Sequence, residues 1–267
     1  MVTAMIALAA FSQGTQDRPK PGALVSKMLA HYHDLSSLTG SIHFTQTAAG
    51  KSLSGETQVQ FQKPNLLYIK QSMSGADASS ARVISNGDRF VYSLPQDTRA
   101  SVQIMGDSRQ AASELVEDVS QWNDEAGAAQ VLNLGQIYGV GGGGLPLHPT
   151  PPLDIAINRQ NDLKSFVGQL ATVEDQGDEK INGRNAHLIG GDWRQYDGTP
   201  VSGTYQIAIT DEGDLLRYIQ KETFVDPRVR GMTPTLITST WMVDLTPNGQ
   251  VNQKLFSDPI LKRRNSK

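Results

Sequence analysis

The sequence contains no cysteine in its 267 residues. This absence excludes a disulfide-stapled scaffold, a thiol nucleophile and a lipid attached to a lipobox cysteine. Charge is also sparse, because charged residues make up 19% of the chain and the formal net charge is -3. Nucleic acids bind to basic surfaces, so we expect no nucleic acid partner.

Long hydrophobic runs are missing as well. The segment 2–11 is apolar and rich in alanine, but it is too short to span a bilayer as a helix. It is typical of the hydrophobic region of a secretory signal, with small residues at Ala7, Ala9 and Ala10. No Lys or Arg precedes it, which leaves a start further upstream or a buried N-terminal segment as alternatives. We expect an exported, periplasmic protein with a signal-like segment and linker at residues 1–22.

The usual signatures of catalysis and metal binding are absent from the sequence. Its five histidines include His31 and His33, which lie two apart on a predicted helix and so point in different directions. Residues 139–144 match the G-x-G-x-x-G pattern formally, but prolines follow in place of a helix. The Walker A motif and the G-x-S-x-G elbow are missing. We therefore predict no metal, no cofactor and no enzymatic activity.

The chain does contain segments in which apolar and polar residues alternate with a period of two. Ile42 and Phe44 alternate with polar residues, and Thr57, Val59 and Phe61 do the same on the next segment. This period indicates strands with one face on apolar material and the other in water. We predict strands at residues 40–48, 54–62, 65–73, 81–86, 89–94, 98–104, 170–177, 184–192, 203–210, 214–225 and 234–245.

Helical spacing is confined to a few segments. Residues 23–38 place Leu24, Met28, Tyr32 and Leu35 on one side, which predicts an amphipathic helix. Residues 139–152 are rich in glycine and proline and predict a loop. Further helices are predicted from Ser113 or Asp107 to Trp122, at 126–137 and at 158–168.

Together these elements predict an α+β fold. We expect a single, strongly curved antiparallel sheet of about eleven strands, an open half-barrel, with helices packed on its concave face. One domain would span residues 23–255, with a central helical and Gly/Pro-rich insert at 107–169. Residues 256–267 would form a basic, solvated tail.

The N-terminal part resembles the LolA-type periplasmic lipoprotein carriers. The similarity covers about residues 23–104 and lies in Phe44-Thr45-Gln46, in the strand from Gly55 to Phe61, and in Lys63-Pro64-Asn65-Leu66. It continues through residues 83–95. The resemblance implies a periplasmic carrier that holds lipoprotein acyl chains or another lipid without chemistry. It also implies that Lys63 is a gating residue that bonds to helix backbone, although that family has Arg more often there.

A curved sheet with an apolar inner face offers a binding cavity if the helices fill it loosely. The resemblance implies a lipid or lipoprotein acyl chains as partners, and a membrane-bound donor or acceptor protein. We expect a monomer. The candidate cavity-lining residues are Ile42, Phe44, Val59, Phe61, Leu67, Ile69, Ile84, Val91 and Tyr92.

Two other interpretations stay open at this stage. The chain could be a non-transporting sensor or interaction module on the same scaffold, similar to the periplasmic regulator that restrains an anti-sigma factor. It could also be an exported enzyme, which would require a bound metal or three converging polar groups in a pocket.

Overall fold

The computed structural model describes residues 19–74, 80–93, 114–118, 148, 150–157, 169–194, 202–224, 234–257 and 261. Within them, one eleven-stranded antiparallel sheet has the order β6-β5-β4-β3-β2-β1-β11-β10-β9-β8-β7. The strands are β1 (Ser37–Ala48), β2 (Lys51–Gln62), β3 (Leu66–Ser74), β4 (Ser80–Asn86), β5 (Arg89–Ser93), β6 (Glu114–Asp118), β7 (Glu174–Ile181), β8 (Arg184–Arg194), β9 (Ser202–Ile209), β10 (Leu215–Phe224) and β11 (Thr235–Pro247).

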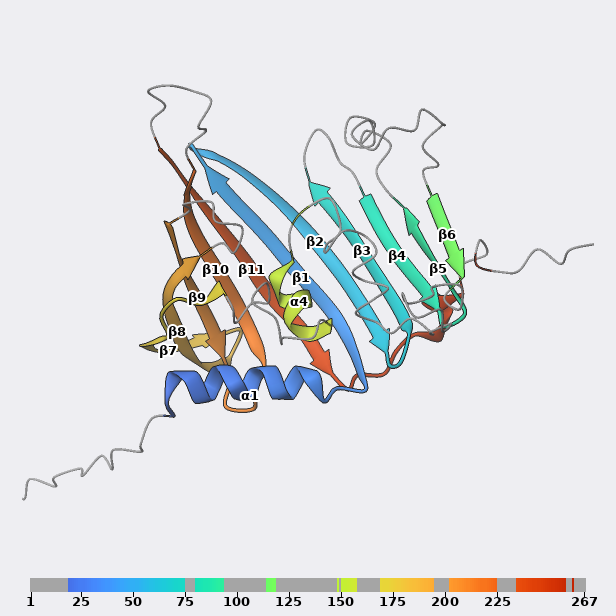
Figure 1. Ribbon diagram of the computed structural model, residues 1–267, viewed down its shortest axis with the longest axis horizontal. Coiled ribbons are helices and arrows are strands. Elements are labelled where there is room, and N and C mark those ends of the chain that lie inside the picture. The colour runs from blue at the N-terminus through green and yellow to red at the C-terminus, as the bar shows by residue number, and fades with distance from the viewer. Residues whose placement is uncertain are drawn as a thin grey trace, which may run out of the picture.

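The sheet consists of two meanders joined along β1 and β11. Strands β1 to β6 follow one another in space, as do β7 to β11, so the first and last strands of the chain meet in the middle (Figure 1). The long register between them pairs Phe44 with Trp241 and Ile42 with Val243. This pairing merges the two halves of the chain into one continuous surface.

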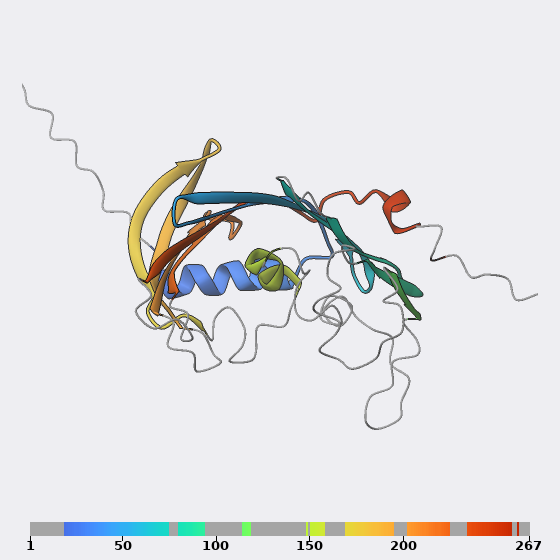
Figure 2. The ribbon, with the colours of Figure 1, turned by 90° about the horizontal axis from the view of Figure 1, so that it is seen from above.

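The sheet is strongly curved, and two described helices lie in its hollow (Figure 2). These are α1 (Pro21–His33) and α4 (Pro151–Ile157), which pack against each other. A short 3-10 helix, η4 (Gln253–Phe256), lies outside, against β3 and β4. The strand order is linear and ends at β6 and β7, so the barrel is open. This architecture confirms the predicted half-barrel with helices on its concave face.

Helix α1 begins with a proline, which suits the first helical turn because its missing N–H has no partner there. Leu24, Val25, Met28 and Tyr32 are buried along one stripe, as the spacing predicts. The helix ends at His33, not at residue 38, because the chain has already entered β1 at Ser37.

Two hairpin turns have residues with positive φ angles. Gly87 has a φ of 93° between β4 and β5. Asn182 and Gly183, with φ angles of 48° and 83°, connect β7 to β8. These angles are accessible to glycine and tolerated by asparagine, which is why the sequence marks the turns so clearly.

The central insert contains the clearest errors of the sequence-based prediction. A helix is predicted from Ser113 or Asp107 to Trp122, but Glu114–Asp118 forms strand β6. Main-chain pairing with β5 outweighs the helical spacing. The loop predicted through Pro151 and Pro152 instead starts α4, because proline is favoured in the first turn. The strand predicted at 98–104 and the helices predicted at 126–137 and 158–168 lie outside the described residues.

Other strand boundaries moved by a few residues. The largest shift is β7, which spans Glu174–Ile181 where 170–177 was expected. The Asn182-Gly183 turn fixes where β7 must end, and Leu170 forms only an isolated bridge with Trp193. The segments 1–22 and 256–267 are described only in part, so the signal-like segment and basic tail stay predictions.

Candidate ligand-binding face

The concave face of the sheet carries a continuous apolar cluster. Because successive side chains on a strand point to opposite faces, every second residue of β1, β2 and β3 faces the hollow. The large apolar residues among them are each at most 2% exposed and belong to one cluster with Tyr218 and Trp241. Six predicted lining residues are brought together there: Ile42, Phe44, Val59, Phe61, Leu67 and Ile69.

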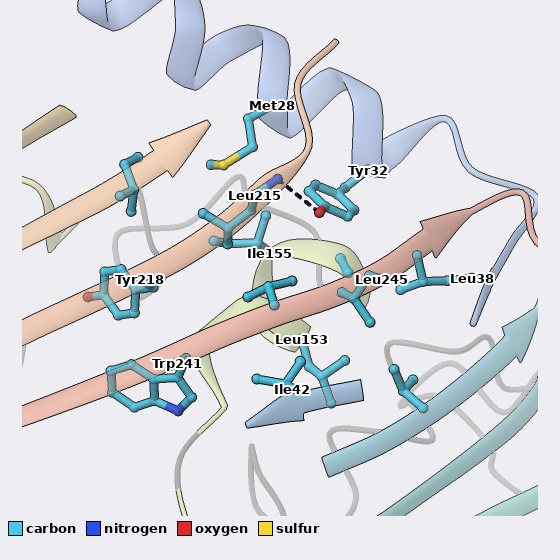
Figure 3. Close-up of a cluster of buried hydrophobic side chains, with 14 of the residues drawn as sticks. Met28, Tyr32, Leu38, Ile42, Leu153, Ile155, Leu215, Tyr218, Trp241 and Leu245 are labelled. Carbon is cyan, nitrogen blue, oxygen red and sulfur yellow. Dashed lines mark hydrogen bonds between the residues drawn. The ribbon is translucent and has the colours of Figure 1, made fainter. Parts of the chain in front are cut away.

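The two helices complete this cluster from inside the hollow. Met28 and Tyr32 of α1 and Leu153 and Ile155 of α4 point toward β10 and β11, which carry Tyr218 and Trp241 (Figure 3). The Trp241 ring lies 5.2 Å from the Tyr218 ring and 5.4 Å from the Phe44 ring, centroid to centroid. Aromatic pairs at such distances add to the gain from burial alone.

Two predicted lining residues belong to a different surface. Ile84 and Val91 are directly paired across β4 and β5, and they cluster with Tyr68 and Leu261 rather than with the concave cluster. Their neighbours in sequence, Val83 and Phe90, are the ones in the concave cluster. The placement of Ile84 and Val91 on the inner face is therefore corrected.

Tyr92 pairs in register with Val83, and its backbone is the only part of it that the structure describes. Its predicted role in lining the face stays a prediction. A run of three apolar residues on β5 covers both faces of the strand, so alternation alone could not assign them.

Lys63, the residue that the family resemblance singles out, contacts helix backbone. Its Nζ donates a hydrogen bond of 2.5 Å to the carbonyl oxygen of His33, the last residue of α1. The last four carbonyls of a helix have no partner inside it, and they carry partial negative charge. A lysine ammonium at this point thus satisfies an orphan acceptor and ties the end of α1 to the end of β2.

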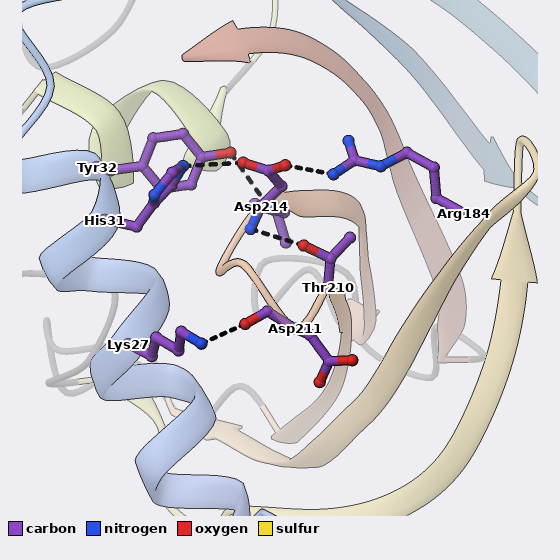
Figure 4. A network of polar contacts seen from close by, with 8 residues as sticks. Lys27, His31, Tyr32, Arg184, Thr210, Asp211 and Asp214 are labelled. Atoms are coloured by element: carbon purple, nitrogen blue, oxygen red, sulfur yellow. Dashed lines mark hydrogen bonds and ion pairs between the residues drawn. The ribbon is translucent and has the colours of Figure 1, made fainter. Parts of the chain in front are cut away.

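A second set of contacts holds α1 at the turn between β9 and β10 (Figure 4). His31 Nε2 lies 2.8 Å from Asp214 Oδ1, and the other oxygen of Asp214 pairs with Arg184. Lys27 donates to the carbonyl oxygen of Asp211. Sequence reasoning missed this clamp, because its members are about 180 residues apart.

Tyr32 joins the clamp from the buried side of α1. Its hydroxyl accepts a hydrogen bond of 3.2 Å from the backbone N–H of Leu215 (Figure 3). Burial raises the pKa of Tyr32 well above its ordinary range. The hydroxyl therefore stays neutral and holds the start of β10 against the helix.

His187 lies on β8 beside the same turn. Its two ring nitrogens lie 2.9 Å from Asp211 Oδ1 and 2.8 Å from Asp178 Oδ1. The hydrogen bond to Asp211, reinforced by Asp178, raises the pKa of His187. When it is protonated, His187 links the β9–β10 turn to β7 through these two carboxylates.

The concave face also carries a small buried polar cluster that the sequence analysis did not identify. Thr57 on β2 and Gln71 on β3 are paired and fully buried, and His148 and Thr150 lie over them. The His148 ring stacks on Phe44 with ring centroids 4.7 Å apart. Glutamine at a position that alternation assigns to the inner face was the one available signal.

The described residues contain no group of three or more His, Cys, Asp or Glu side chains that could hold a metal ion. Of the described helices, none is long and apolar enough to cross a membrane. The described side chains of the concave cluster offer apolar contact, and those of the Gln71 cluster offer uncharged hydrogen bonds.

No protein-family model and no curated protein matches the chain. Solved structures do resemble it. Lipoprotein LppX from Mycobacterium tuberculosis is 14% identical, with a TM-score of 0.37 over 87% of this chain and 99% of that one. LprF from Mycobacterium bovis is 11% identical, with a TM-score of 0.40 over 90% of this chain and 98% of that one.

A third similar structure is a LolA superfamily protein from Nitrosomonas europaea. It is 11% identical, with a TM-score of 0.30 over 91% of this chain and 100% of that one. At these identities and TM-scores the likenesses carry no argument about function.

Proposed function

We propose that the chain is a periplasmic carrier that binds lipoprotein acyl chains or another lipid against its concave face and does no chemistry on them. The observation that carries this proposal is the continuous apolar cluster of the curved sheet, over which the described helices are short. α1 has 13 residues and α4 has seven, against eleven strands. Each methylene that moves from water to such a surface contributes roughly 0.8 kcal/mol.

Helix α1 is the element that would open to admit the ligand. It contributes apolar side chains to the cluster, yet polar contacts along its C-terminal half hold it in place: Lys63 contacts its last residue, and the β9–β10 turn contacts Lys27 and His31. Polar contacts of this kind exchange readily with water, whereas the buried apolar contacts of the strands do not. In this proposal they set how long a ligand stays bound.

The test is binding of a fluorescent fatty acid or lipopeptide to delipidated protein. Saturable uptake supports a carrier. Protein that takes up no lipid but recovers one membrane protein in stoichiometric amount would instead be an interaction module.

A matched pair of variants locates the binding face. Val83 and Ile84 are adjacent on β4, and both are buried, but only Val83 belongs to the concave cluster. Val83→Phe should reduce uptake of long chains by filling the hollow, and Ile84→Phe should leave uptake unchanged. Equal loss in the two variants, or none in either, would contradict binding on the concave face.

A further inference from the structure

The polar cluster on the concave face is built around the side-chain amide of Gln71. This residue is 0% exposed and lies on β3 between the inner-face residue Ile69 and the end of the strand. Its paired neighbours are Thr57 on β2 and Ala81 on β4, both buried. An amide in such surroundings needs all of its hydrogen bonds to be made within the protein or to a ligand.

The nitrogen of that amide has hydrogen-bond acceptors for both of its hydrogens. Gln71 Nε2 donates to the carbonyl oxygen of His148 at 2.9 Å and to Thr150 Oγ1 at 2.8 Å, with Thr57 Oγ1 at 3.3 Å. A backbone carbonyl can only accept, so the contact with His148 fixes which end of the amide is nitrogen. Gln71 therefore anchors the segment that leads into α4.

The oxygen half of the amide has no such partner. Within the described part of the chain, no group donates a hydrogen bond to Gln71 Oε1, although the atom is buried. Buried acceptors are almost always paired in folded proteins. A lone buried acceptor on the inner face of the sheet thus marks a place where a donor from a bound molecule would be stabilised.

The side chains around Gln71 Oε1 limit which donor group of a bound molecule would be stabilised there. The four side chains of the cluster, from Thr57, Gln71, His148 and Thr150, include no carboxylate, so an ammonium group would lose its hydration without gaining a counter-charge. An amide would bring a carbonyl that needs a donor of its own. A hydroxyl satisfies Oε1 with a single O–H bond, and the apolar residues around the cluster suit the hydrocarbon on either side of it.

We propose that Gln71 Oε1 accepts a hydrogen bond from a hydroxyl group on the bound acyl chain, so that the protein selects hydroxylated lipids. This inference rests on the proposed lipid-binding function. It predicts selectivity by the position of the hydroxyl, because Gln71 is fixed on the strand and an acyl chain in the hollow can place only certain carbons beside it.

The experiment measures dissociation constants of delipidated protein for stearate and for a series of hydroxystearates that differ only in the position of the hydroxyl. These isomers cost the same to dehydrate, so differences among them report the site. We expect one isomer to bind about fivefold more tightly than the others, which is the effect of one net hydrogen bond of about 1 kcal/mol.

Two variants distinguish the effect of losing Oε1 from the effect of disturbing the hydrogen bonds around it. Gln71→Met keeps the size of the side chain but removes Oε1, and it should abolish the preference while stearate still binds. Thr150→Val removes one partner of Nε2 and leaves Oε1 in place, so the preference should persist. Loss of the preference in both variants would assign it to general disruption of the cluster and overturn the proposal.

Wild-type protein gives a second test that does not depend on any variant folding. If it binds stearate saturably but all isomers equally, a resident water satisfies Oε1; the inference is then wrong and the carrier function stands. If neither stearate nor any isomer binds saturably, lipid binding itself is refuted and the inference with it.

Discussion

The contact between Lys63 and helix α1 makes a prediction that can be worked through in full. Lys63→Met removes the ammonium that donates to the His33 carbonyl at 2.5 Å and keeps much of the side-chain length. A hydrogen bond from a charged group contributes about 1.5–3 kcal/mol when it is protected from water. This one is exposed, so we expect a loss of about 1 kcal/mol, in the range of exposed ion pairs.

A loss of about 1 kcal/mol raises the open population of α1 about fivefold. Hydrogen exchange of the α1 amides should accelerate by that factor, because these amides exchange through local opening. Dissociation of a bound fluorescent fatty acid should accelerate similarly. Amides of β1 and β11, in the middle of the sheet, should not change.

The control is Lys70→Met, which removes an equal charge from an exposed lysine on β3. Lys63→Arg should retain most of the stabilisation of α1, because a guanidinium group also donates hydrogen bonds, although with a different geometry. Unchanged α1 exchange in Lys63→Met, or an equal acceleration in Lys70→Met, would refute the latch.

Four other predictions concern residues of α1, β1 and β8. Tyr32→Phe leaves the N–H of Leu215 buried without an acceptor, and it should lower the free energy of unfolding in urea by about 1–3 kcal/mol. Because the folded pKa of His187 is raised, its stabilisation is full below the unfolded value near 6.5 and is lost as the pH rises through the folded value. Unfolding titrations of wild type and His187→Gln should therefore differ most in acid and converge at alkaline pH. Gly40→Ala should destabilise by about 2–4 kcal/mol, because Gly40 has a φ of 142° and a Cβ would lie 2.1 Å from a backbone oxygen of β11; Gly22→Ala, with nothing within 4 Å, should stabilise α1 by up to about 1 kcal/mol.

The outcome at the concave face shows where alternation is informative. On β1 and β2, polar residues separate the apolar ones, so Phe44 and Val59 were assigned to the inner face correctly. On β4 and β5 the apolar residues are adjacent, and Ile84 and Val91 were assigned to the wrong face. Such runs occur because both faces are covered there, the outer one by Leu261, which follows β4 by more than 170 positions.

The conformation of a turn depends on a few neighbouring residues, so turns can be recognised from the sequence. Asn182 and Gly183 specify their hairpin through φ angles that few residues tolerate. Strand β6 was misread as a helix because its state depends on the free edge of β5, which no local pattern encodes. The pairing of β1 with β11, about 200 positions apart, was likewise outside the reach of any local signal.

The sequence by itself determined the kind of sheet, its turns and the apolar character of one face, because these follow from spacing between near neighbours and from the conformational limits of single residues. Only the tertiary structure decided which side of β4 faces the hollow, how the β9–β10 turn holds α1, and that no group in the described part of the chain donates a hydrogen bond to the buried oxygen of Gln71. Each of these depends on contacts between segments far apart in the chain, where packing geometry, and not local periodicity, sets the partners.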